Sequence, residues 1–183
     1  MPAPCTWLRQ VHGVDVCVVA ARGQHVGAAA DAAVTAVPGC SLVVRTADCV
    51  PIALLADEAV GVAHAGWRGL VGGVVEAAVA ALRELGAGSV RATIGPCIRA
   101  GCYEFRGAER DEVAARYGDE VRATTVWGTP ALDLVAGARA ALAGAGVTEV
   151  QVAGGCTACD SAWFSHRARG EDARQGSFVW LEP

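Results

Sequence analysis

The feature that most constrains this fold is a series of short, valine-rich apolar runs in the N-terminal part of the chain. Turn-prone residues separate the runs, and Pro38 followed by Gly39 marks one turn clearly. The five runs are residues 14–20, 32–37, 41–46, 50–56 and 59–65. Because several of them are apolar almost throughout, they predict strands that are covered on both faces.

The period of the apolar residues changes after the sequence HAGWRG. Apolar residues then recur at three- and four-residue spacing, which predicts an amphipathic helix over residues 71–86. Further helices are predicted over residues 108–117 and 130–143. For the last, Thr129 is the expected N-cap and Pro130 the first helical residue. Three more strands are predicted over residues 90–95, 149–155 and 177–181.

This order of elements predicts one α+β domain of residues 1–183, with mixed β-sheets packed with helices in layers. The chain is 53% apolar and 19% charged, which is typical of a compact core. A net charge of -4 without a basic block argues against nucleic acid as a partner. No apolar run reaches the ~18–20 residues of a membrane span, and the start MPAPC does not resemble a signal peptide. We therefore expect a cytoplasmic protein, monomeric or weakly dimeric, with no membrane partner.

Three residues near predicted strand ends could form a site. Read alone, Cys49 in TADCVPI is a packed thiol before a strand, and His12 in QVHG and His64 in AHAGWRG are structural. Together, one thiolate and two imidazoles supply three ligands for zinc and leave a fourth position open, as in catalytic sites. Alternatively, Cys49 is a metal-free nucleophile with His64 or His12 as its base. Spacings of 37 and 15 residues match no compact zinc finger and leave these alternatives open.

Other residues offer further chemistry. Four cysteines, in PCIRAGC and CTAC, could build a structural zinc site with four thiolates, because cytosolic cysteines are more often thiols or ligands than disulfides. They are Cys97, Cys102, Cys156 and Cys159. Arg68 stands at a predicted helix start, where it and the free backbone N–H groups could share an anion such as phosphate. The alternative for Arg68 is a solvated or carboxylate-paired side chain.

Several strings together carry a family resemblance. QVHG, TADCVPI, AHAGWRGL, GPCI with CYEF, and CT followed by FSHR resemble, in order and spacing, the bacterial YfiH-type family of laccase-like, multicopper polyphenol oxidoreductases. The likeness runs from about residue 8 to the C-terminus. Family members also carry an N-terminal segment with an Arg-x-Gly-Gly motif, so the expected domain of residues 1–183 lacks that segment. The family's FFSYRR reads WFSHRA here, which places His166 where the family has a tyrosine.

The resemblance implies a zinc-dependent purine nucleoside phosphorylase that cleaves adenosine, inosine and methylthioadenosine and also deaminates adenosine. The implied partners are purine nucleosides and phosphate, and the implied metal ligands are His12, Cys49 and His64. Zn²⁺ is the expected cofactor, and copper is the alternative. A true multicopper oxidase needs about ten histidines, whereas this chain has four.

The expected catalytic residues are Cys49, His64, Asp48 and Arg68. Arg68 is the candidate for holding phosphate, and Asp48 is the candidate for orienting a ligand histidine or moving a proton. Three alternatives remain at this level: a copper-dependent phenol oxidase, a metal-free Cys–His hydrolase, and a zinc-stabilised binding module without turnover.

Overall fold

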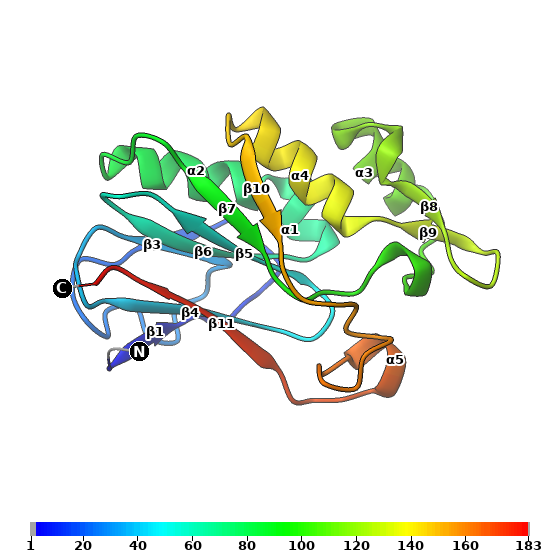
Figure 1. The fold of residues 1–183 in the computed structure, drawn as a ribbon, viewed down its shortest axis with the longest axis horizontal. Coiled ribbons are helices and arrows are strands. Elements are labelled where there is room, and N and C mark those ends of the chain that lie inside the picture. The colour runs from blue at the N-terminus through cyan, green and yellow to red at the C-terminus, as the bar shows by residue number, and fades with distance from the viewer. Residues whose placement is uncertain (1–2, 183) are drawn as a thin grey trace.

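Nine of the strands form two stacked sheets, a separate two-stranded sheet lies beside them, and helices cover the outer face of the largest sheet (Figure 1). The computed structural model describes residues 3–182. Met1, Pro2 and Pro183, which the predicted domain includes, lie outside this range. The sheets are mixed and the helices form a layer, which confirms the predicted α+β class.

The larger sheet has six strands in the order β10-β7-β5-β6-β3-β2. Their bounds are β2 (Val16–Val18), β3 (Ala32–Thr35), β5 (Val50–Leu55), β6 (Val60–Ala65), β7 (Arg91–Ile94) and β10 (Glu149–Val152). The outer pairs β2/β3 and β7/β10 are parallel, and the inner pairs are antiparallel. All six residues of β6 are buried, so the sheet is covered on both faces, as the apolar runs predict.

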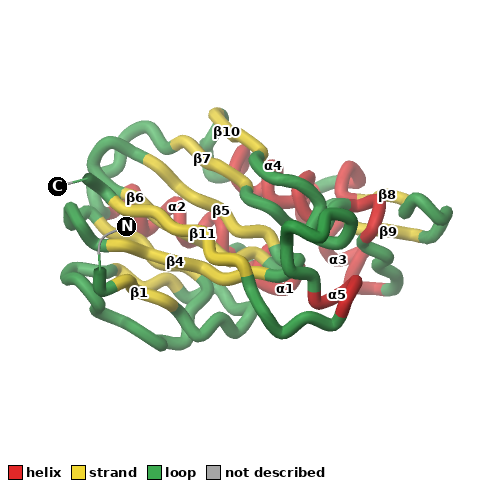
Figure 2. Tube along the Cα trace, turned by 60° about the horizontal axis from the view of Figure 1, so that its bottom comes forward, coloured by secondary structure: helices red, strands yellow, loops and turns green. Residues whose placement is uncertain are grey.

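The smaller sheet consists of β1 (Cys5–Trp7), β4 (Ser41–Thr46) and β11 (Gln175–Trp180), which lie side by side in Figure 2. β4 is its central strand, parallel to β1 and antiparallel to β11. A second core packs around this sheet and includes side chains of both sheets. Its largest members are Leu8, Val19, Leu42, Val44, Val60, Val62 and Val179. The two sheets are therefore held together by buried aliphatic surface.

Helices α1 (Trp67–Gly72), α2 (Val74–Glu84) and α4 (Leu134–Gly144) pack on the other face of the larger sheet. The predicted helix over residues 71–86 is thus two helices. Gly73 separates them with a φ of 100°, and its N–H donates to the carbonyls at the end of α1. This left-handed conformation favours glycine, which explains the break.

Helix α3 (Ala108–Tyr117) matches its prediction, whereas the predicted start of α4 at Pro130 is wrong. Pro130 opens β9 (Pro130–Leu132), where a strand's first residue tolerates the missing N–H. β9 pairs with β8 (Arg122–Thr124). The N-cap is Asp133, whose carboxylate accepts the N–H groups of Val135 and Ala136, and the predicted cap Thr129 instead bonds Glu104.

The remaining elements are short. They are the 3-10 helices η1 (Ala100–Cys102) and η2 (Asp119–Val121) and helix α5 (His166–Arg169). Over the described part of the chain, no helix combines the length and apolarity that a membrane span needs.

Candidate metal centre

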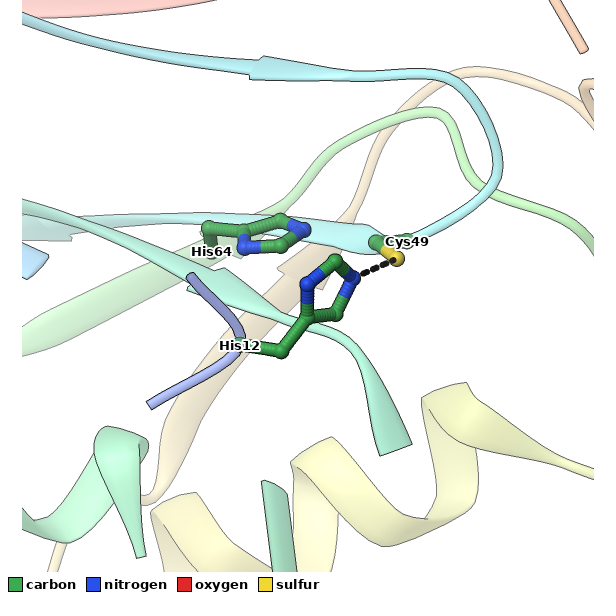
Figure 3. A group of neighbouring side chains, drawn as sticks. All are labelled: His12, Cys49 and His64. Atoms are coloured by element: carbon green, nitrogen blue, oxygen red, sulfur yellow. Dashed lines mark hydrogen bonds between the residues drawn. The ribbon is translucent and has the colours of Figure 1, made fainter. Parts of the chain in front are cut away.

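His12, Cys49 and His64 come together beside the start of β5 and the end of β6 (Figure 3). His12 lies in the loop after β1, Cys49 directly precedes β5, and His64 belongs to β6, next to β5. Their candidate ligand atoms lie within 4.8 Å of one another. The Cys49 sulfur is 3.8 Å from His12 Nε2, and the two imidazole centroids are 4.8 Å apart. The structure thus gathers the three residues that the sequence places 37 and 15 positions apart.

The buried carboxylate of Asp31 orients both histidines. Its Oδ1 lies 2.8 Å from His64 Nδ1, which leaves Nε2 as the nitrogen open to the site. The same carboxylate accepts the backbone N–H groups of Val11, His12 and Gly13 at 3.1, 3.0 and 2.7 Å. These bonds hold His12 at a φ of 59°, a left-handed conformation that is unusual for histidine. Sequence reasoning missed Asp31, although it is the lone carboxylate in the run AAADAAVT.

Burial and hydrogen bonding act in opposite directions on these groups. Burial raises the pKa of the Cys49 thiol, but hydrogen bonds and positive charge from His12 and His64 outweigh it and bring the pKa to about 6. Burial lowers the pKa of His64, but Asp31 and Cys49 raise it to about 9. Without a metal, Cys49 is therefore mainly a thiolate at neutral pH, the form that serves as ligand or nucleophile.

The donor set fits a borderline-soft metal ion. Two imidazole nitrogens and one thiolate are ligands that zinc prefers, and the carboxylate on His64 Nδ1 is the usual partner of a metal-bound histidine. His64 is buried, whereas His12 is exposed, so the group opens to one side. Three protein ligands with an open side match a catalytic rather than a closed structural metal site.

The open side faces a cleft of about 610 Å³. Its lining residues are Leu8, Arg9, Gln10, His12, Arg45, Thr46, Ala47, Cys49, His64, His166, Asp172 and Arg174. Gln10 fixes one wall, because its side-chain amide bonds both the N–H and the carbonyl of Arg45 at 2.9 and 2.8 Å. The cleft therefore combines the candidate metal ligands with three arginines that the sequence does not mark.

Arg68, the predicted phosphate residue, does not line this cleft. Its side chain is exposed, and its guanidinium carbon lies 4.6 Å from the centroid of the Trp67 ring. Arg68 is thus not among the residues that line the cleft with the three ligands. Arg9, Arg45 and Arg174 are the cleft residues that could hold an anion.

Asp48, predicted to orient a ligand histidine or move a proton, is buried, and its carboxylate bonds to a segment that contains none of the three ligands. Its Oδ1 accepts the hydroxyls of Thr157 and Ser165 at 2.7 Å each, and its Oδ2 accepts the N–H of Arg167 at 2.7 Å. These bonds compensate for a φ of 101° at Asp48. The structure therefore makes Asp48 the anchor of the segment that carries His166, and Asp31 the residue that orients the histidines.

Comparison with known proteins assigns the chain to a family. The family model of the multi-copper polyphenol oxidoreductase laccases matches residues 1–182. The chain belongs to this family. The match covers His12, Cys49 and His64 and every residue that lines the cleft.

Several relatives of this laccase-like chain carry a different name. It is 46% identical to a purine nucleoside phosphorylase of Streptomyces coelicolor, over 99% of this chain and 76% of the relative. It is 40% identical to a purine nucleoside phosphorylase of Mycobacterium tuberculosis, over 96% of this chain and 72% of the relative. The crystal structure of YlmD from Geobacillus stearothermophilus superposes with a TM-score of 0.86 at 33% identity, covering 98% of this chain and 74% of that one.

Proposed function

We propose that this protein is a zinc-dependent purine nucleoside phosphorylase that cleaves adenosine, inosine and methylthioadenosine and also deaminates adenosine. The observation that carries the proposal is the group of His12, Cys49 and His64, oriented by Asp31 at a cleft with three arginines. The names of the relatives support the nucleoside substrate. The cleft is large enough for a nucleoside, since ligand sites typically span ~300–1,000 Å³.

Zinc held by His12, Cys49 and His64 would supply a Lewis acid and lower the pKa of a bound water toward about 7. Asp31 keeps His64 Nδ1 occupied, so that Nε2 is presented to the ion. The buried side of the group excludes water, and the exposed side admits substrate. In deamination, water adds at purine C6 and ammonia leaves, which converts adenosine to inosine.

Phosphorolysis needs different groups in the same cleft. A phosphate oxygen forms a bond to ribose C1′ as the bond from C1′ to the purine nitrogen breaks, and the purine takes up a proton. Arg9, Arg45 and Arg174 supply the positive charge that holds phosphate. His166 is the cleft imidazole outside the ligand set, and it can donate the proton to the leaving purine.

Product analysis tests the proposal. Purified protein should release hypoxanthine from inosine only when phosphate is present, and it should release ammonia from adenosine without phosphate. Cys49→Ala should lose activity and the zinc ion held with His12 and His64, whereas Cys17→Ser, which alters a half-buried thiol outside the cleft, should keep both. Phosphate-dependent cleavage at the wild-type rate by a Cys49→Ala protein that holds no zinc in the cleft would disprove the metal-dependent function.

A metal-free Cys–His hydrolase is the second candidate, because the Cys49 thiol has a pKa of about 6 and lies 3.8 Å from His12 Nε2. It predicts activity that survives a strong chelator but not alkylation of Cys49. The family's name suggests a copper phenol oxidase instead. That function predicts phenol oxidation that depends on added copper, which the four histidines of this chain do not favour.

A further inference from the structure

A second group of metal-ligating side chains lies outside the cleft. The sulfur atoms of Cys102, Cys156 and Cys159 lie within 4.8 Å of one another. Cys102 ends η1, and the other two belong to the sequence CTAC after β10. β7 and β10 are parallel neighbours, and a bridge between Cys97 and Cys156 extends their pairing. The loops that leave two adjacent strand ends therefore bring the three thiols together.

The sequence CTAC folds into a turn in which the sulfur of its first cysteine, Cys156, accepts a backbone hydrogen bond. The donor is the backbone N–H of Arg99, at 3.3 Å. Backbone N–H groups directed at a sulfur stabilise its thiolate form, which is the form that binds metals. Cys102 and Cys156 are half-buried and Cys159 is exposed, so an ion can reach the group.

We propose that Cys102, Cys156 and Cys159 form a second metal site, which binds a thiophilic ion such as Zn²⁺ through three thiolates. Soft thiolate ligands select such ions over Mg²⁺ or Ca²⁺. The site shares no residue with the group of His12, Cys49 and His64 and does not depend on the proposed enzymatic activity. The fourth position is open to solvent or to an exogenous ligand.

The fourth cysteine predicted for such a site does not take part. Cys97 is fully buried in the main core, and its sulfur does not belong to the group of potential ligands. The Cys102 and Cys159 sulfurs lie 2.7 Å apart. Thiolates bound tetrahedrally at about 2.3 Å from zinc lie roughly 3.8 Å apart, so metal binding moves this pair apart by about 1 Å. The exposed Cys159 side chain has room to make that movement.

The site would brace one wall of the cleft. Thr157, inside the CTAC turn, donates its hydroxyl to Asp48, which directly precedes Cys49. Asp48 also accepts bonds from Ser165 and Arg167 on either side of His166. An ion that cross-links η1 to the CTAC turn would therefore fix the segment that positions His166.

Metal stoichiometry tests the second site. Reduced full-length protein, loaded with Zn²⁺ and desalted, should hold two zinc ions per chain, and Cys49→Ala and Cys159→Ser should each hold one. The matched control Cys17→Ser should hold two. When Co²⁺ replaces zinc, the thiolate-to-cobalt absorption of Cys49→Ala, with three thiolates, should exceed that of Cys159→Ser, in which only Cys49 supplies a thiolate to the intact site.

A second measurement needs no variant. Zn²⁺ should slow the alkylation of Cys102, Cys156 and Cys159 in wild-type protein, relative to Cys17, by at least tenfold in peptide mass spectra. Equal alkylation rates with and without Zn²⁺ would overturn the proposal. A disulfide between Cys102 and Cys159 in reduced, zinc-loaded protein would also overturn it.

Discussion

At the scale of single residues, one buried carboxylate connects two candidate ligands. Asp31 fixes the tautomer of His64 through Nδ1 and holds the backbone on both sides of His12. Burial raises the pKa of Asp31, but hydrogen bonds from His64 and the loop outweigh it and keep the pKa below its usual value. The carboxylate therefore stays ionised and can polarise His64 toward a metal ion.

Asp31→Asn should weaken zinc binding by about 10–100-fold, because an amide cannot accept all the N–H groups that the carboxylate accepts. Zinc affinity, measured by competition with a chelator, checks this. The control Asp15→Asn changes an exposed carboxylate on the loop that carries His12 and should leave the affinity unchanged. Wild-type affinity in Asp31→Asn would show that the ligands need no orienting carboxylate.

The cleft arginines give a prediction that distinguishes the phosphate-binding residues indicated by the structure from the one predicted from the sequence. Glutamine substitution of Arg9 or Arg45 should raise the KM for phosphate about tenfold or more, because a charge-assisted hydrogen bond contributes about 1.5–3 kcal/mol. Arg68→Gln should leave this KM unchanged, since Arg68 lies outside the cleft. Steady-state kinetics at varied phosphate measure it, and the reverse pattern would restore Arg68 as the phosphate residue.

The motifs identify the ligands but not the residues that support them. His12, Cys49 and His64 stand in distinctive strings, and the structure brings all three together. Asp48 also stands in such a string, yet its carboxylate bonds Thr157 and Ser165, more than one hundred positions away. Contacts over that separation depend on the sheet order, which local sequence does not encode.

At the scale of elements, periodicity predicts most helices and strands. It fails where a capping side chain determines the residue at which a helix begins. β4 has its predicted bounds, and α3 does as well. The start of α4 is displaced from Pro130 to Leu134, because Asp133 caps the helix and Pro130 pairs with Thr124 in a hairpin. Two capping signals within five residues compete, and tertiary pairing chooses between them.

The junction of β6 and α1 has a steric requirement. Gly66 has an ordinary φ of -73°, so its backbone would accept alanine. A Cβ there would lie 2.7 Å from the His12 ring and 3.1 Å from the Cys49 sulfur. The junction therefore leaves room for the ligands only when it lacks a side chain.

Gly66→Ala should keep the fold but lower zinc affinity at least tenfold, because the methyl group displaces His12. Circular dichroism and chelator competition together check this. Gly144→Ala is the matched control, since nothing lies within 4 Å of the Cβ that it adds at the end of α4. Equal zinc affinity in the two variants would contradict the requirement for space at this junction.

At the scale of the whole molecule, the candidate centre exists because the chain changes sheets. β4 is the middle strand of the small sheet, β5 lies within the large one, and only residues 47–49 connect them. The loop after β1 brings His12 close to Cys49 in this connection, and β6 supplies His64 beside β5. The valine-rich runs predict the strands, but only the assembled sheets show why three distant motifs meet.

Zinc should therefore stabilise the whole fold, because it cross-links segments from both sheets. At one hundred times the dissociation constant, one bound ion adds about 2.7 kcal/mol, or about 5–10 °C in Tm for a domain of this size. Thermal unfolding of reduced protein with Zn²⁺ and with a strong chelator measures the shift.

Arg68→Gln should show the full shift, because it leaves both groups of ligands intact. Cys49→Ala should retain only the part contributed by the three-cysteine site, and Cys49→Ala combined with Cys159→Ser should retain none. A Tm that the chelator leaves unchanged in wild-type protein would mean that neither site binds zinc in the folded molecule.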